Sequence, residues 1–463
     1  MGVMTTTLVL PGNLAAELLR IAQLEIETGA VLLARLVDVS NGDIRLLGRE
    51  LLLVPEDAYQ VREADVLKIS SDGYVPFLHY AEDASCVPIW LHTHVGKDAS
   101  PRPSMLDEEV DNQLSDLFRL RTGSDYYGSL IVSHMNGILR FTGFLENDKG
   151  RRNLDRLFSV GSRFSLVRSD YEKQKEIAPI YDRNIRAFGG EIQAVLHDLK
   201  IAIIGCGGTG SAMVEQLARL GVRNFVLVDP DYLSDSNITR VYGSASDDVG
   251  RAKVEIAAEN VMKIAPDAHV DQLLSTITVE GAVKNLVGVD LIFGCTDDNA
   301  GRLILSRFAY FMITPVIDCG VILTSGSENL IRGIDGRITL MYPGTACLVC
   351  RDRIDISRAS AEMLKPEERI RLADEGYAPA LPDVEPAVVS YTTIISAMAI
   401  SELLERLVHY GPDTVPSEIL IRLHEREMSG NQCPPQEKHY CHPRTGKIGL
   451  GLTDPFLEMA WTT

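Results

Sequence analysis

The chain has few cysteines and little positive charge for its length. Eight cysteines are spread over 463 residues, too few and too dispersed for a disulfide framework, which predicts a cytoplasmic protein. The formal net charge of −19 argues against nucleic acid as the main partner, because phosphate contacts require a basic face. The same charge is compatible with docking of a small carrier protein that presents a basic patch.

The sequence shows neither a signal peptide nor a membrane-spanning run. The residues after Met1 lack the signal-peptide pattern, which again predicts a cytoplasmic location. A largely apolar run over 391–410 carries Ser and Thr residues and then Glu402 and Glu405. We therefore expect a packed core helix there and no membrane partner.

Length and apolar content predict two domains. A chain of 463 residues with 45% apolar residues can bury two cores. We expect a mixed α+β domain over 1–147, a connector over 148–179, and an α/β domain over 180–463. In the last domain strands and helices alternate, which predicts a mostly parallel, Rossmann-like sheet covered on both faces.

A glycine-rich loop is the most informative motif of the second domain. It follows the apolar strand 201–204, precedes a helical run, and contains Gly205, Gly207, Gly208 and Gly210. Such glycines let backbone N–H groups approach phosphates at a helix start. Asp229 and Asp231 end the next strand, where an acid suits a ribose. Taken alone, this pattern fits an NAD-binding dehydrogenase equally well.

Polar groups that follow the successive strands favour ATP over NAD. These groups are Asn237, Arg240, Lys253 and Asp297. Nucleotidyl transfer from ATP needs cations to hold the polyanion, a carboxylate for Mg²⁺, and charge neutralisation for the departing pyrophosphate. The alternative is a set of solvated surface charges, which their order and spacing disfavour.

With these motifs, residues 180–441 resemble the ThiF/MoeB/HesA superfamily of ubiquitin-activating-type enzymes. These enzymes adenylate the C-terminal glycine of a ubiquitin-like or sulfur-carrier protein. The resemblance implies that the four glycines cradle ATP, that Asp231 binds the ribose, and that Asp297 is linked to Mg²⁺. It also assigns phosphate contacts to Asn237, Arg240 and Lys253, and it matches Arg302 to the arginine five residues after that aspartate. One position departs from the pattern, because Asp298 replaces the usual asparagine.

The same resemblance implies a homodimer. Arg183, just before the first strand, matches a segment that reaches the ATP phosphates of the neighbouring subunit. The alternative is an ordinary helical arginine with a solvent-exposed head.

Cysteine spacing predicts a structural zinc site. Cys347 and Cys350 have the spacing of a zinc knuckle, and the family completes such a site with a second pair near the C-terminus. Here that pair would be Cys433 and Cys441. Because their separation exceeds Cys-x-x-Cys, the fourth ligand could instead be His439 or His442. The alternative is four unlinked thiols.

No cysteine stands where thioester-forming members of the superfamily carry their nucleophile. The stretch 351–390 contains none, so the resemblance supports adenylation more firmly than transfer to a thioester and onward to a conjugating-type carrier. Cys319, at a strand end, is the remaining candidate, and a small apolar strand residue is the simpler interpretation of it.

A second constellation lies in the first domain. His92 and His94 point to the same side of a strand end, and Asp107 from the following helix can complete three Zn²⁺ ligands with a position left for water. Glu27 could serve as general base and Ser104 as a donor to an oxyanion. Ser104 and Asp107 are also a helix-capping pair, which needs no metal.

These residues resemble the JAB/MPN (JAMM) metalloproteases, which cleave ubiquitin-like proteins after their C-terminal glycine. The family has seven residues between the second histidine and the serine, whereas this chain has nine, 95–103. The family's proline after that histidine is Val95 here.

Together the motifs predict a fused enzyme of a prokaryotic-type ubiquitin-like pathway that uses ATP, Mg²⁺ and Zn²⁺. One alternative is activation of a sulfur carrier for cofactor or cysteine biosynthesis, which the missing cysteine favours. Another is a first domain that is an inactive binding scaffold.

Overall fold

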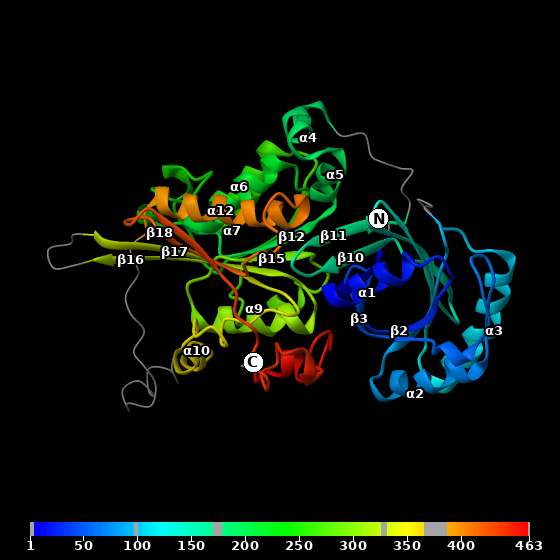
Figure 1. The fold of residues 1–463 in the computed structure, drawn as a ribbon. Helices are drawn as coiled ribbons and strands as arrows, with labels where there is room; N and C mark the ends of the chain where they lie inside the picture. The colour runs from blue at the N-terminus through cyan, green and yellow to red at the C-terminus, as the bar shows by residue number, and fades with distance from the viewer. Residues whose placement is uncertain (1–3, 97–100, 170–177, 326–330, 365–386, 462–463) are drawn as a thin grey trace. The chain divides into compact units, whose positions relative to one another are not determined.

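The chain folds into two compact units, each with its own central sheet (Figure 1). The structure is a computed structural model that describes residues 4–96, 101–169, 178–325, 331–364 and 387–461. The first unit comprises Met1–Gln174 and Gly449–Gly451, and the second comprises Lys175–Ile448 and Leu452–Thr463.

The first unit is built on a nine-stranded mixed sheet with the order β11-β10-β1-β3-β2-β6-β7-β8-β9. The strands and helices of this unit are β1 (Thr6–Pro11), α1 (Gly12–Ala22), β2 (Gly29–Asp38), β3 (Ile44–Leu53), β4 (Tyr59–Arg62), β5 (Leu67–Ile69), α2 (Val75–Asp83), β6 (Val87–Thr93), α3 (Met105–Thr122), β7 (Tyr127–Met135), β8 (Ile138–Asn147), β9 (Gly150–Asn153), β10 (Arg156–Val160) and β11 (Phe164–Arg168). Strands β4 and β5 form a separate two-stranded ribbon.

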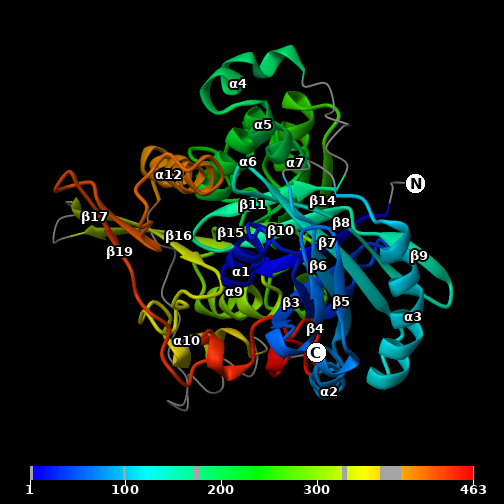
Figure 2. The same ribbon diagram turned by 45° about the vertical axis from the view of Figure 1, so that its right-hand side comes forward.

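Side-chain alternation along β2 divides the core of this unit in two. Leu32 and Ala34 pack in the cluster that contains α1, whereas Val31 and Leu33 pack in the cluster that contains α2 and α3. Successive residues of a strand point to opposite faces, so helices cover both faces of the sheet. In Figure 2, α1 and α3 lie on opposite sides of the strands labelled β6 and β7.

Three strands lie where the sequence predicted a connector. Strand β9 pairs with β8, β10 pairs in parallel with β1, and β11 pairs with β10. Leu157, Phe158 and Val160 of β10 are buried, so residues 150–168 belong to the sheet. The pattern was missed because arginines interrupt the apolar alternation. Residues 170–177 of the predicted connector lie outside the described residues.

The second unit has an eight-stranded sheet with the order β14-β13-β12-β15-β16-β17-β18-β19. Strands β12 to β16 pair in parallel, and β16 to β19 pair antiparallel. The elements are α4 (Asp182–Phe188), α5 (Gly190–Asp198), β12 (Lys200–Ile204), α6 (Gly208–Leu220), β13 (Asn224–Val228), α7 (Lys253–Ile264), β14 (His269–Leu273), α8 (Glu280–Lys284), β15 (Leu291–Gly294), α9 (Asn299–Phe311), β16 (Val316–Ser325), β17 (Ile331–Met341), α10 (Ile356–Glu362), α12 (Val389–Val408), β18 (Glu418–Arg422) and β19 (Glu427–Asn431).

Helices cover both faces of this sheet, as the strand–helix alternation predicted. Helices α6, α7 and α12 lie on one face and α9 and α10 on the other (Figure 1). Strand β12 is buried on both sides, since the adjacent residues Ile201 and Ala202, which point to opposite faces, are both inaccessible to solvent. The predicted apolar helix is confirmed as α12. No helix in the described ranges combines the length and apolar character that a membrane crossing requires. The unit is therefore a mixed α/β fold with a largely parallel sheet.

Candidate nucleotide and metal sites

A pocket of about 1180 Å³ opens where the parallel strands of the second unit end. The carboxyl ends of parallel strands meet at one edge of a sheet, where α/β folds bind ligands. Ten of the predicted nucleotide-site residues line it: Gly205, Gly207, Gly208, Asp229, Asp231, Asn237, Arg240, Lys253, Asp297 and Arg302. The structure thus brings together residues that are nearly one hundred positions apart.

The glycine loop owes its shape to two different requirements. Gly205 has φ +94°, a left-handed conformation that side chains disfavour. Gly210 does not line the pocket, and a Cβ there would stand 1.8 Å from the carbonyl oxygen of Gly205. Gly210 therefore lets the loop pack against its own helix, while Gly207 and Gly208 face the pocket at the start of α6.

Asp229 ties the glycine loop to the end of β13. Its two carboxylate oxygens accept hydrogen bonds from the backbone N–H groups of Cys206 at 2.6 Å and Asp231 at 2.8 Å. Burial raises the pKa of Asp229, and the positive charge of Lys253 opposes that rise. With both oxygens engaged by backbone, this carboxylate orders the loop.

The predicted ribose and phosphate groups meet at the start of α7. Lys253, which is 9% exposed, donates to the carboxylate of Asp231 at 2.7 Å. Arg240 is half-buried and donates to the carbonyl of Ser236 at 3.1 Å. A guanidinium and an ammonium therefore line one cavity, an arrangement suited to a polyphosphate.

The residue that departs from the family pattern has a structural partner. Asp298 caps α9 by accepting from the backbone N–H of Gly301, and it also accepts from the hydroxyl of Thr296. Asp297, in contrast, is exposed and lines the pocket. The cap satisfies a helix N-terminus and leaves Asp297 as the carboxylate available to a cation.

Several pocket residues were missed by the sequence analysis. Arg337 on β17 donates to Asp318 on β16 at 2.7 Å, and Arg422 on β18 also lines the pocket. These residues follow no motif, because antiparallel strands from the far half of the sheet bring them there. Arg183 is exposed on α4 and does not line the pocket. Its predicted contact is with a neighbouring subunit and stays a prediction.

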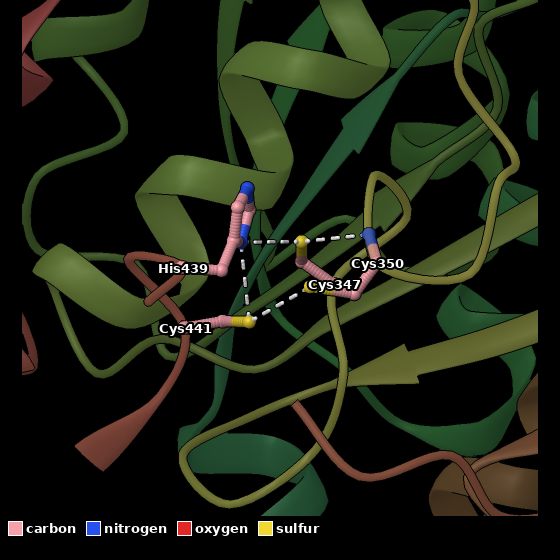
Figure 3. Close-up of side chains that lie close together, drawn as sticks. All are labelled: Cys347, Cys350, His439 and Cys441. Carbon is pink, nitrogen blue, oxygen red and sulfur yellow. Dashed lines mark hydrogen bonds between the residues drawn. The ribbon is translucent and has the colours of Figure 1, made fainter. Parts of the chain in front are cut away.

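Four side chains form a candidate zinc site in the second unit (Figure 3). Three of the distances between ligand atoms are 3.6 Å for Cys350 Sγ to Cys441 Sγ and 3.4 Å from His439 Nδ1 to the Sγ atoms of Cys347 and Cys441. A tetrahedron with Zn–S bonds of about 2.3 Å and a Zn–N bond of about 2.0 Å has S–S edges of roughly 3.8 Å and S–N edges of roughly 3.5 Å, close to the observed distances. The donor set therefore fits Zn²⁺.

His439 takes the place predicted for Cys433. The Sγ of Cys433 donates instead to the carbonyl of Pro434 at 3.6 Å, and Cys433 does not belong to the group. The hydrogen bond from Cys441, with a further one from His439, lowers the pKa of Cys347 to about 4 against the opposing effect of burial. A thiol that ionises easily is a ready metal ligand.

The first unit contains a second candidate metal group, His92, His94 and Asp107. The Nε2 atoms of the histidines lie 3.3 Å apart and 3.1 and 3.4 Å from the two oxygens of Asp107. These separations match the edges of about 3.3 Å expected for bonds of about 2.0 Å to Zn²⁺. Burial opposes ionisation of Asp107, but hydrogen bonds from both histidines outweigh it and lower its pKa.

The capping interpretation of Ser104 also holds, and it supports the metal group. Ser104 Oγ accepts from the backbone N–H of Asp107 at 3.2 Å, and Asp107 accepts from that of Ser104 at 2.7 Å. This capping box at the start of α3 fixes the carboxylate beside the histidines. The enlarged loop 95–103 lies partly outside the described residues.

Glu27 is held at the start of β2 by its backbone. Its N–H donates to the carbonyl of Glu63 at 2.9 Å, and its carbonyl accepts from Nε of Arg62 at 2.9 Å. The residue is 8% exposed. Burial raises the pKa of its carboxyl, and the neighbouring His92 and His94 oppose that rise. Sequence reasoning missed Arg62, which no motif marks.

Comparison with known proteins bears on the second unit. A family model described as the ThiF family matches residues 181–442. The chain is 31% identical over 169 residues to ubiquitin-like modifier-activating enzyme 5 of Drosophila pseudoobscura pseudoobscura, covering 34% of this chain and 40% of that one. It is 28% identical over 162 residues to the SAMP-activating enzyme E1 of Haloferax volcanii, covering 35% and 56%. The chain thus spans between two fifths and somewhat over half of these relatives.

Among solved structures, the chain is similar to that of E. coli MccB with ATP. The TM-score is 0.44 at 19% identity, and the match covers 56% of this chain and 73% of that one.

Proposed function

The chain belongs to the ThiF family, and we propose that its second unit adenylates the C-terminal glycine of a ubiquitin-like or sulfur-carrier protein. One observation carries the proposal: the glycine loop, Lys253, Arg240 and Asp297 all line one pocket. A dehydrogenase has little use for this combination, whereas a nucleotidyl transfer requires it.

In the proposed reaction a carboxylate oxygen of the carrier attacks the α-phosphorus of ATP. The new P–O bond gives an acyl-adenylate, and the bond to pyrophosphate breaks. Backbone amides at the start of α6 would hold phosphate oxygens, and Arg240 and Lys253 would neutralise the departing pyrophosphate. Asp297 is placed to hold Mg²⁺, which when bound neutralises further phosphate charge. Positioning and charge neutralisation supply most of the rate.

We assign the reaction to a prokaryotic-type ubiquitin-like conjugation pathway, as a homodimer in which Arg183 reaches the partner's nucleotide. Support for the substrate class comes from the relatives, which are named for activating a ubiquitin-like modifier and SAMP. Sulfur-carrier activation is the second pathway, favoured by the absence of cysteine from 351–390. Transfer of the activated glycine to a conjugating-type enzyme or to a sulfurtransferase decides between them.

Mass spectrometry of the carrier tests the chemistry. Candidate carriers that end in glycine are incubated with the full chain and Mg·ATP, and we expect a carrier–AMP adduct. The variants Asp297→Ala and Arg240→Ala should abolish the adduct, while Arg219→Ala, an exposed α6 arginine outside the pocket, should keep it. Absence of the adduct with every carrier would refute the proposal.

A second activity is proposed for the first unit, as a JAMM-type zinc peptidase that cleaves after the same glycine. The convergence of His92, His94 and Asp107 within metal-ligand distances favours it. Zn²⁺ bound there would act as a Lewis acid on the scissile carbonyl. Glu27 would take a proton from the attacking water and pass it to the leaving amine, while Ser104 Oγ–H would donate to the oxyanion. Cleavage of a carrier precursor separates this activity from a binding scaffold.

A further inference from the structure

Two arginines and one aspartate form a cluster in the pocket wall beyond Asp297. Nη2 of Arg337 donates to Oδ2 of Asp318 at 2.7 Å, and Nε of Arg302 lies 3.5 Å from Oδ1. The Asp318 side chain is 1% exposed, whereas each arginine side chain is 17% exposed. One carboxylate thus faces two guanidinium groups, which gives the cluster a net positive charge.

The cluster has more donors than acceptors. Each guanidinium offers five N–H donors, and Asp318 is shared between them. The Nε atoms of both arginines and Oδ1 of Asp318 are buried without a hydrogen-bond partner among the described residues. Buried donors without acceptors are costly and rare in native proteins, so they point to a ligand, ion or water that supplies the missing acceptor.

The two guanidinium groups flank an open position on the backbone. A Cβ at Gly320 would lie 3.5 Å from Nη2 of Arg302 and 3.7 Å from Nη2 of Arg337. Because Gly320 has no side chain, the space between these two nitrogens stays accessible from the pocket. A planar carboxylate matches guanidinium forks in shape and charge.

The cluster occupies the opposite end of the pocket from the ribose group. The predicted ribose and phosphate groups follow β13, β12 and β15, whereas Asp318 and Gly320 lie on β16 and Arg337 on β17. Strand β16 is two strands from β12, a separation of about 10 Å. Arg302 lies on α9, which begins just after Asp297. An anion at the cluster would therefore lie on the far side of Asp297 from the ribose.

We propose that Arg337 and Arg302, across the open backbone of Gly320, bind the terminal carboxylate of the carrier before it attacks ATP. The inference rests on the proposed adenylation, and it assigns Arg302 to binding the carrier carboxylate, whereas the sequence analysis placed it in the nucleotide site. A phosphate of ATP shares the same chemistry and is the competing occupant. Holding the carboxylate beside the α-phosphorus of ATP orients it for attack and so raises the reaction rate.

The test uses the full chain loaded with the non-hydrolysable analogue Mg·AMPCPP. A synthetic decapeptide ending in Gly-Gly is titrated in two forms, with a free carboxylate and as the C-terminal amide. We expect the wild type to bind the acid about tenfold or more tightly than the amide, as for a charge-assisted hydrogen bond. Arg337→Gln should lose this preference while its affinity for AMPCPP stays within about twofold.

Two further variants complete the test. Arg422→Gln, a second pocket arginine that is paired with Glu427, should keep the preference. Gly320→Ala should lose it without a folding defect, because the added methyl meets only ordinary contacts. Equal binding of acid and amide by the wild type overturns the proposal, and so does a loss of AMPCPP affinity in Arg337→Gln, which identifies a phosphate. Failure of adenylation itself is seen separately, as the absence of a carrier–AMP adduct.

Discussion

The ammonium of Lys253 donates to the carboxylate of Asp231 at 2.7 Å, although the two residues were assigned to different parts of the nucleotide. A second carboxylate oxygen, from Asp229, lies 3.9 Å from the same nitrogen. Asp231 is largely exposed, with 63% of its side chain accessible. The residues predicted to bind the ribose and the phosphates are thus joined by one ion pair.

This pair predicts coupled effects on ATP binding. Asp231→Ala and Lys253→Ala should each weaken binding of Mg·ATP about tenfold or more. The loss of binding free energy in the double variant should be smaller than the sum of the two single losses. We expect a coupling free energy of about 1 kcal/mol, because each single substitution also removes the ion-pair partner of the other residue. Isothermal titration of all four proteins measures the cycle. Additive losses would show that the residues act independently.

The zinc site predicts that substitutions of Cys441 and Cys433 differ in their effect on zinc content and thermal stability. Cys441→Ser should reduce the zinc content of the chain by one ion and lower the melting temperature by several degrees, since a structural site couples metal binding to folding. Cys433→Ser should leave both unchanged, because its thiol lies outside the ligand group. Elemental analysis with thermal unfolding checks both variants. Zinc loss in Cys433→Ser would restore the all-cysteine assignment.

The helix cap at Asp298 predicts that two substitutions of this residue differ in their effect on stability. Asp298→Asn should keep the stability of the second unit, because asparagine caps helices as well as aspartate does. Asp298→Ala should lower the free energy of unfolding of this unit by about 1 kcal/mol. Urea unfolding is followed with and without Mg·ATP. A bound ligand stabilises the unit that holds it, so the transition whose midpoint shifts with Mg·ATP belongs to the second unit, and the midpoint of that transition is compared between the variants. Equal midpoints for the two variants would show that the hydrogen bond to Gly301 does not stabilise α9.

The proposed peptidase site of the first unit predicts that one substitution slows cleavage but leaves zinc bound, whereas another impairs both cleavage and zinc binding. Glu27→Gln should retain zinc but slow cleavage of a carrier precursor by about 10²- to 10⁴-fold, because it removes the general base. His92→Ala should lose the zinc as well. His79→Ala is the matched control, since His79 is exposed, forms an ion pair with Asp83 on its own helix, and does not belong to the candidate metal group. Full cleavage by Glu27→Gln would contradict the assigned base, and no cleavage by the wild type would favour a scaffold.

The convergence of the predicted residues on one pocket could be predicted from the sequence, because the signals are local. The strand 201–204, the glycines and Asp231 follow one another within thirty residues, and the strand–helix alternation fixes where they meet. Local capping likewise placed Asp107 beside the two histidines. These are short-range patterns in which backbone geometry nearly determines the side-chain positions.

The features that the sequence missed or left open depend on contacts between distant segments. The sequence left Cys433 and His439 open as ligands beside Cys347, because the choice depends on the path of the chain after β19, which no spacing rule encodes. Arg337 and Asp318 meet through the antiparallel pairing of β16 with β17, and neither belongs to a motif. The strands over 150–168 were hidden because arginines interrupt their apolar alternation, and two of them, β9 and β11, are edge strands of the sheet, where charged residues are common.

Adenylation of a carrier by the second unit can be measured as ATP–pyrophosphate exchange in the presence of a glycine-ended carrier. We expect exchange of labelled pyrophosphate into ATP that requires both the carrier and Mg²⁺, that persists in Arg219→Ala, and that is lost in Asp297→Ala. Exchange that proceeds without any carrier, or that is undiminished in Asp297→Ala, would contradict the proposed adenylation.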